Sequence, residues 1–138
     1  MAGIFVESIP ARGGYQLRNH LLDRLGARGR SDGATYHLKI SLREQRLGVA
    51  IRPNASITRY NYTLLARYDL MRADDSAAVK SGNVSALAAY NVATSPYATV
   101  VAEQDASNRA AGDIAERLRV ELAVFFAEEA SSMAASLQ

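Results

Sequence analysis

Apolar and polar residues alternate with a period of two through the middle of the chain, the pattern of strands with one buried face. A first alternating run covers residues 35–43, and a longer one extends from Ile57 to Leu70. A third covers residues 83–92 and stops before Ser95-Pro96. We predict a strand for each run. Most apolar positions of the first two runs are even-numbered: Tyr36, Leu38, Ile40, Leu42, Tyr60, Tyr62, Leu64, Ala66, Tyr68 and Leu70. Leu65 and Met71 break the polarity of the other face, which indicates that this face is partly covered or offered to a partner.

Three further segments complete the predicted elements. A short apolar run before Pro10 predicts a strand at about residues 3–8. Leucines at helical spacing predict a helix over 15–25, with Gly26 as its C-cap. Ser95 and Pro96 suit the N-cap and first position of a long second helix. Its apolar stripe consists of Val100, Ala111, Ile114, Ala115, Leu118, Leu122 and Phe125.

The connecting segments carry turn and loop residues. Residues 28–33 are polar and glycine-containing, and Pro53 predicts a bulge, edge irregularity or short loop. Residues 73–76 lack the glycine of a tight hairpin, so we expect a longer connection there. The order is β-α-β-β-β-α. We therefore predict a single α+β domain over residues 1–138, with its core in about 3–126, a frayed tail at 130–138, and two helices on one face of a four-stranded mixed sheet.

The formal net charge of +2 conceals an asymmetry between the two halves of the chain. Residues 1–72 contain 12 basic and 5 acidic residues, whereas residues 73–138 contain 4 basic and 9 acidic ones. Between Lys39 and Arg72 there are seven basic residues and two acidic ones. The predicted sheet therefore carries a positive field, which favours anionic partners such as phosphates, lipid head groups or nucleic acid. Ordinary solvated charge, or protection of edge strands by charge, is the alternative.

Little in the sequence indicates catalysis. Cysteine is absent, which excludes thiol nucleophiles, thiolate metal sites and disulfides. His20 and His37 have no partner at metal-ligand spacing, and paired carboxylates such as Asp74-Asp75 do not converge on one face. Nucleotide-binding and hydrolase motifs are missing. We expect no catalytic residue, no metal site and no cofactor.

The basic residues and the tyrosines of the predicted sheet lie on opposite faces. Lys39 and Arg43 share the polar face of one strand, as Arg59 and Arg67 do on the next. Strand pairing could gather them into one patch of hydrogen-bond donors for phosphates or carboxylates. The tyrosines of the longest run fall on the apolar face, where packing competes with base stacking. This separation counts against nucleic acid as the partner.

Several segments resemble the LptE family of lipopolysaccharide-assembly lipoproteins. The likeness covers roughly residues 3–126 and consists of diffuse patterns rather than catalytic signatures. The segments that carry it are 17–25, 36–40 and 60–69, and above all Tyr97-Ala98 with 102–106 leading into 114–118. The resemblance implies two helices packed on a four-stranded sheet, in agreement with the order deduced from the pattern.

The resemblance also implies a function and a location. Such proteins are tethered by lipid to the periplasmic side of the outer membrane of Gram-negative cells. There they act as a plug in the LptD-type β-barrel and help to deliver lipopolysaccharide to the cell surface. The family's lipidated cysteine is missing from this sequence, and we expect the chain to start after it; the alternative is a protein without this anchor. Met1–Glu7 does not look like a signal peptide, and no apolar run is long enough to span a bilayer, so we expect a soluble domain.

These observations give one site hypothesis and two rival functions. We expect Arg52 and Arg59, flanking the Pro53 irregularity, together with Lys39, Arg43 and Arg67, to contact lipid A phosphates or acidic sugars. The first rival is a module that binds nucleic acid or another polyanion through the same sheet. The second is an enzyme whose site the chain assembles from residues far apart in sequence, which would require a concave pocket with convergent titratable groups.

Overall fold

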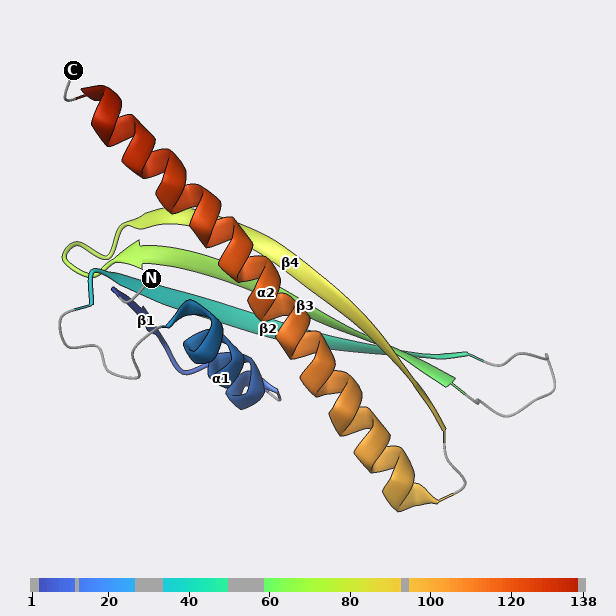
Figure 1. The fold of residues 1–138 in the computed structure, drawn as a ribbon. Helices are drawn as coiled ribbons and strands as arrows, with labels where there is room; N and C mark the ends of the chain where they lie inside the picture. The colour runs from blue at the N-terminus through green and yellow to red at the C-terminus, as the bar shows by residue number, and fades with distance from the viewer. Residues whose placement is uncertain (1–2, 12, 27–33, 50–58, 93–94, 137–138) are drawn as a thin grey trace.

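The computed structural model describes residues 3–11, 13–26, 34–49, 59–92 and 95–136. The elements follow the predicted order, and the α+β class is confirmed (Figure 1). The predicted loop at 28–33 and the irregularity at Pro53 lie outside the described residues. The elements are β1 (Ile4–Val6), α1 (Gly14–Leu25), β2 (Tyr36–Val49), β3 (Arg59–Arg72), β4 (Ala78–Asn91) and α2 (Pro96–Ser136).

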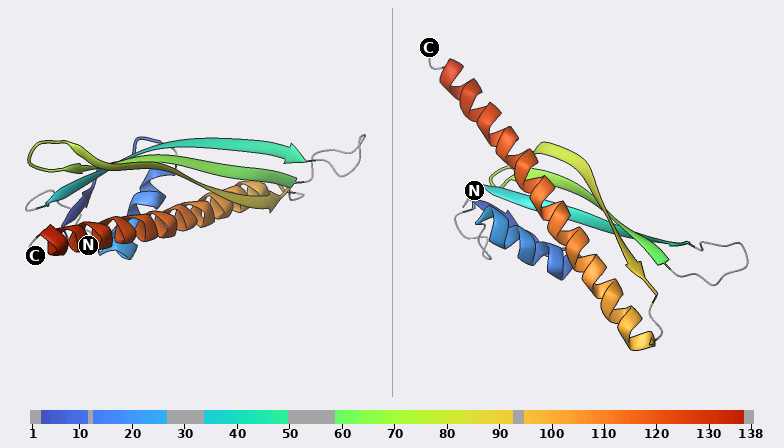
Figure 2. Two further views of the ribbon diagram at one scale, coloured as in Figure 1. Left: turned by 90° about the horizontal axis from the view of Figure 1, so that it is seen from above. Right: turned by 45° about the vertical axis from the view of Figure 1, so that its right-hand side comes forward.

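The four strands form one mixed sheet in the order β1-β2-β3-β4. The short β1 pairs in parallel with the start of β2, whereas β2–β3 and β3–β4 are antiparallel. Figure 2 shows both helices on the same side of this sheet. Helix α2 packs on β3, β4 and α1, and α1 packs on β1 and α2. One face of the sheet is therefore covered by helices, and we refer to the other as the open face.

The even-numbered residues of β2 and β3 face the helices and form much of the core. Tyr62 and Tyr68 are buried, as are Leu38, Ile40, Leu64 and Leu70. Both tyrosines hydrogen-bond carboxylates: Tyr62 donates to Glu44 of β2 over 2.7 Å, with Ser107 Oγ of α2 3.3 Å away, and Tyr68 donates to Glu121 of α2 over 2.5 Å. A buried hydroxyl needs such a partner, because desolvation without one is costly. The alternation therefore predicted correctly which face is buried.

The helix ends follow the signals in the sequence. Gly26 adopts φ 60°, a left-handed conformation that favours glycine, at the C-cap of α1. Ser95 Oγ accepts a hydrogen bond from the Ala98 backbone N–H over 3.4 Å, and α2 begins at Pro96. The apolar stripe of α2 was predicted from Val100, but Val100 is 49% exposed and the first buried residue of the helix is Ala106. Residues 130–136, expected to fray, are part of α2.

The last hairpin differs from the prediction in its length. Strand β4 begins at Ala78, well before the alternating run that predicts it. The connection from β3 is longer than a two-residue turn, as expected, and it contains Ser76 in a left-handed conformation at φ 57°. Because β4 starts early, Ser81 and Gly82 pair with Asp69 and Tyr68 of β3, ahead of Asn83 opposite Arg67. This extension brings polar residues of β4 onto the open face beside β3.

Candidate functional site

The open face is formed by the odd-numbered residues of β2 and β3 and by their partners in β4. Lys39, Arg43 and Arg67 are exposed on this face, as the sequence predicts. Arg67 pairs with Ser41, which lies between Lys39 and Arg43 along β2. Diagonal neighbours on adjacent strands are about 7–8 Å apart, so the register places Arg67 beside both cations. We refer to Lys39, Arg43 and Arg67 as the cationic cluster.

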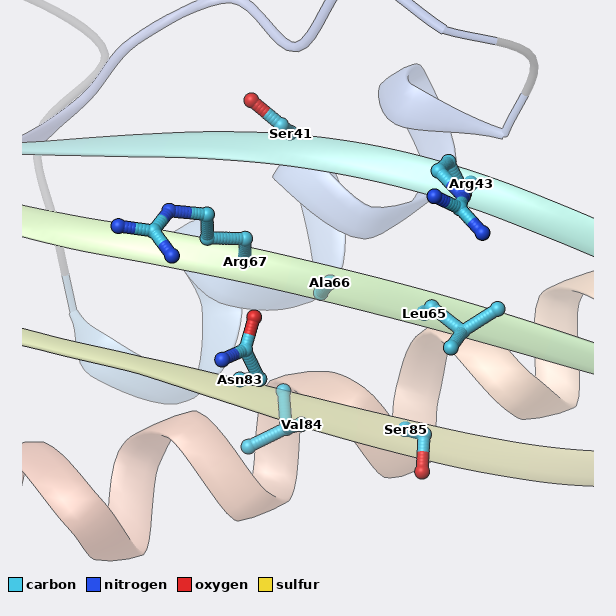
Figure 3. A pocket seen from close by; sticks show the side chains of 8 residues that line it. All are labelled: Ser41, Arg43, Leu65, Ala66, Arg67, Asn83, Val84 and Ser85. Atoms are coloured by element: carbon cyan, nitrogen blue, oxygen red, sulfur yellow. The ribbon is translucent and has the colours of Figure 1, made fainter.

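A depression of about 470 Å³ lies at Arg43 and Arg67 of this cluster. Figure 3 views it with the helices behind the sheet, and the side chains of Ser41, Arg43 and Arg67 stand on the near side of the strands. Its lining combines donors and apolar groups: Ser41, Arg43, Leu65, Ala66, Arg67, Asn83, Val84 and Ser85. Guanidinium groups beside hydroxyl and amide side chains suit phosphate or carboxylate oxygens.

Arg43 and Arg67 form no close ion pair in the part of the chain that the structure describes. Within the described part of the chain, neither arginine has a carboxylate oxygen within 4.0 Å. Their partners across the strands are neutral, namely Leu65 for Arg43, and Ser41 and Asn83 for Arg67. Lys39 differs because it lies opposite Asp69, whose carboxylate accepts a 2.6 Å hydrogen bond from Ser81. Arg43 and Arg67 are thus the strongest anion-binding candidates of the cluster.

Most other arginines of the described chain are engaged in contacts within the protein. Arg18 donates to the Val6 carbonyl, and Arg46 lies 3.0 Å from Glu103 of α2. Hydrogen bonding to Tyr90, followed by the charge of Glu103, raises the pKa of Arg46. Arg46 counts toward the basic density of β2, but its even position places it on the covered face. The others in such contacts are Arg24, Arg72, Arg109 and Arg119.

The remaining predicted site residues do not join the cationic cluster. Arg59 is exposed on the open face, but it pairs with Val49, eight residues along β3 from Arg67. At about 3.3 Å per residue these positions are about 26 Å apart. Arg52 lies outside the described residues. The structure therefore brings together three of the five predicted residues.

Sequence reasoning missed three polar residues that line the depression. Ser41, Asn83 and Ser85 contribute a hydroxyl, an amide and a second hydroxyl. Their odd positions match the phase of the exposed face, so the alternation contained a signal for them. Their proximity to Arg43 and Arg67 depends on the strand register, which alternation alone does not determine.

The rival functions find less support in this geometry. Tyr62 and Tyr68 are buried against α2 and cannot stack on bases. His20 Nε2 lies 2.9 Å from Asn108 Oδ1, and His37 lies 3.8 Å from Glu7. Over the described ranges, no three His, Asp or Glu side chains cluster in a way that could hold a metal ion. Neither helix, in its described length, has the apolar stretch needed to cross a bilayer.

Together, fold and site define a two-layer α+β protein with one uncovered, cationic sheet face. The chain belongs to the LptE family, whose model, described as lipopolysaccharide-assembly, matches residues 1–122. Its role is therefore in lipopolysaccharide assembly. The family consists of lipoproteins associated with the outer membrane, and they are not enzymes. Comparison with curated protein sequences gave no significant match.

Solved structures include similar proteins. A candidate lipoprotein from Caulobacter crescentus CB15 is 32% identical, with a TM-score of 0.80 and 93% of each chain covered. Rare lipoprotein B from Shewanella oneidensis is 11% identical, with a TM-score of 0.66 over 91% of this chain and 96% of its own. A minor lipoprotein from Acinetobacter baumannii is 15% identical, with a TM-score of 0.66 over 88% and 90%. The last two similarities concern the fold alone.

Proposed function

We propose that this chain serves lipopolysaccharide transport as the plug and partner subunit of an LptD-type outer-membrane barrel, and that its open face binds lipopolysaccharide. Family membership supports the transport role and the choice of partner. A lipid anchor at the periplasmic side of the outer membrane is part of the same proposal. The contact with lipopolysaccharide is supported by the charge and the shape of the open face.

One observation carries the binding proposal. Arg43 and Arg67 are exposed at the same depression, and among the described residues neither has a carboxylate partner. An anion at this depression gains charge-assisted hydrogen bonds from either guanidinium group, without breaking an ion pair to any described residue. Lipid A carries phosphates, which suit this geometry. Lys39 extends the same site, and Arg59 offers a separate contact at the far end of the face.

Charge reversal tests the anion site. Arg67→Glu is expected to weaken binding of purified lipopolysaccharide at moderate ionic strength about tenfold or more, since a hydrogen bond to a charged group contributes about 1.5–3 kcal/mol. Arg117→Glu is the matched control, because Arg117 is equally an exposed arginine but belongs to α2 in the helical layer. Equal affinity of the folded Arg67→Glu variant and the wild type would contradict the proposal.

The partner is tested separately by co-purification. A tagged form of the chain, produced together with an LptD-type barrel, is expected to retain the barrel through detergent extraction and affinity purification. Arg67→Glu should retain the barrel as well if its effect is confined to lipopolysaccharide. Failure to recover the barrel with the wild-type chain would remove the partner assignment and leave the anion site to be judged by the binding measurement.

A further inference from the structure

Beyond the cationic cluster the open face carries two exposed leucines, Leu47 and Leu87, and the half-buried Leu65. Leu65 lies beside the cluster, between Arg43 of β2 and Ser85 of β4. Leu87 of β4 is 62% exposed and Leu47 of β2 is 67% exposed. All three occupy odd positions and therefore share the face of Arg67. We refer to Leu47, Leu65 and Leu87 as the leucine patch.

The leucine patch lies on one side of the cluster along the strands. Starting from the pair Ser41–Arg67, the next pairs are Arg43–Leu65, Gln45–Thr63 and Leu47–Asn61. Leu87 lies opposite Thr63, and Ala89 lies opposite Asn61. In the direction of Val49 the face thus changes from cationic to uncharged, with leucine and alanine among neutral polar side chains, until Arg59. Large apolar side chains this exposed lose favourable free energy unless another apolar group covers them.

The dimensions of the patch fit an acyl chain. The pair that contains Leu65 and the pair that contains Leu47 are four residues apart along β2, which corresponds to about 13 Å. One leaflet of a bilayer has an apolar thickness of about 15 Å, half of the hydrocarbon core. A phosphate at Arg43 and Arg67 would therefore leave an attached acyl chain within reach of the whole patch.

We propose that the leucine patch is an acyl-chain subsite and that the open face binds an anionic amphiphile in one direction. The phosphate lies at the depression between Arg43 and Arg67, and an acyl chain extends over Leu65 and Leu87 toward Leu47. This orientation rests on the proposed function for its anion site. Exposed leucines and exposed arginines on one face favour a lipid as the occupant, because a lipid carries both chemistries in one molecule.

Two probes separate the subsite from the anion site. The first is lipid A below its aggregation concentration, and the second is its fully deacylated, bisphosphorylated disaccharide, which keeps the phosphates and lacks the chains. The double variant Leu47→Thr/Leu87→Thr is expected to bind lipid A about tenfold more weakly and the disaccharide as the wild type does. Threonine suits an exposed strand position, so the fold should persist.

The controls distinguish the possible failures. Val120→Thr/Val124→Thr removes exposed valines from α2 and should leave both affinities unchanged. Arg67→Glu should weaken both probes. If Arg67→Glu weakens both while the leucine variant binds lipid A normally, the acyl subsite is wrong and the anion site stands. A leucine variant that loses only the barrel, or that loses both probes equally, also overturns the subsite. If Arg67→Glu affects neither probe, the anion site fails.

Discussion

Gly82 lies directly opposite Tyr68 in the β3–β4 ladder, and its missing side chain makes room for the tyrosine ring. A Cβ atom on Gly82 would come within 2.9 Å of Tyr68 Cε1 and 3.0 Å of its hydroxyl. The ring cannot easily move away, because Tyr68 is buried and its hydroxyl is bound to Glu121. We therefore expect Gly82→Val to lower the free energy of unfolding by about 1–3 kcal/mol.

Denaturant unfolding followed by circular dichroism measures this loss. Gly3→Ala is the control, since the nearest atom to a Cβ there is Thr35 Oγ1 at 3.4 Å, an ordinary contact. If Gly82→Val leaves the midpoint unchanged, the close packing of Tyr68 against β4 is wrong. A partial recovery in Gly82→Val/Tyr68→Leu, where a smaller side chain replaces the ring, would attribute the loss to this contact.

Because Tyr68 is buried, we expect the protein to lose stability at alkaline pH. Burial, followed by the hydrogen bond to Glu121 and its charge, raises the pKa of Tyr68 above its ordinary value. An unfolded tyrosine deprotonates near pH 10, so above about pH 10 the unfolded chain holds fewer protons than the folded one. The contribution of Tyr68 to the free energy of unfolding is therefore fully present below about pH 10 and is lost as the pH rises above it.

Unfolding measured between pH 9 and 11 tests this expectation. The free energy of unfolding should fall above about pH 10, with at most about 1.4 kcal/mol per pH unit from this group. The slope should be shallower in Tyr68→Phe, because that side chain does not titrate. Tyr97→Phe is the control, since Tyr97 is 79% exposed. An identical slope in Tyr68→Phe and the wild type would show that Tyr68 makes no contribution.

Much of the fold could be predicted because the apolar phase of β2 and β3 is uninterrupted at the buried positions. The start of β4 at Ala78 could not be predicted, because Ser81 and Gly82 are poor strand formers. They are held in the sheet by pairing with β3, which is a tertiary effect. Val100 was misplaced for a similar reason, since it repeats the spacing of the buried stripe, while burial on α2 begins only at Ala106.

For the candidate site, too, the alternating pattern predicted which face a residue lies on, but not which residues pair across neighbouring strands. The phase of the alternation predicted that Lys39, Arg43 and Arg67 share a face. It also contained the information that Arg46 lies on the other face, because Arg46 is in phase with Ile40 and Leu42. The position of Arg67 opposite Ser41 required the register, which the sequence does not display.

Substitution of Gly112 in α2 by alanine is expected to stabilise the protein, whereas substitution of Gly82 is expected to destabilise it. Gly112 is buried where α1 crosses, and a Cβ there would lie 3.6 Å from both Arg24 Nη2 and His20 Cε1, in ordinary contact. Glycine inside a helix costs about 0.5–1 kcal/mol relative to alanine. Gly112→Ala should therefore raise the free energy of unfolding by about that amount, whereas Gly112→Leu should lower it by pushing α1 away. A destabilised Gly112→Ala variant in thermal unfolding would mean that the helices approach more closely than the structure indicates.

Arg43 and Arg46 are three residues apart on β2, and their opposite orientations predict opposite consequences of the same substitution. Arg46→Glu places a second carboxylate beside Glu103 and removes the cation from the Tyr60 ring, whose centre lies 5.8 Å from the Arg46 guanidinium carbon. Because Glu103 is only 15% exposed, we expect a loss of about 1–2 kcal/mol in stability.

Arg43→Glu should instead leave stability within about 0.5 kcal/mol, as for other surface positions, since Arg43 forms no ion pair with the described residues. Its effect should fall on the affinity for lipopolysaccharide, which we expect to drop about tenfold. Measuring unfolding and binding on both variants makes each one the control for the other. If Arg43→Glu destabilised the fold and Arg46→Glu reduced binding without destabilising it, the open face would not be the ligand-binding face.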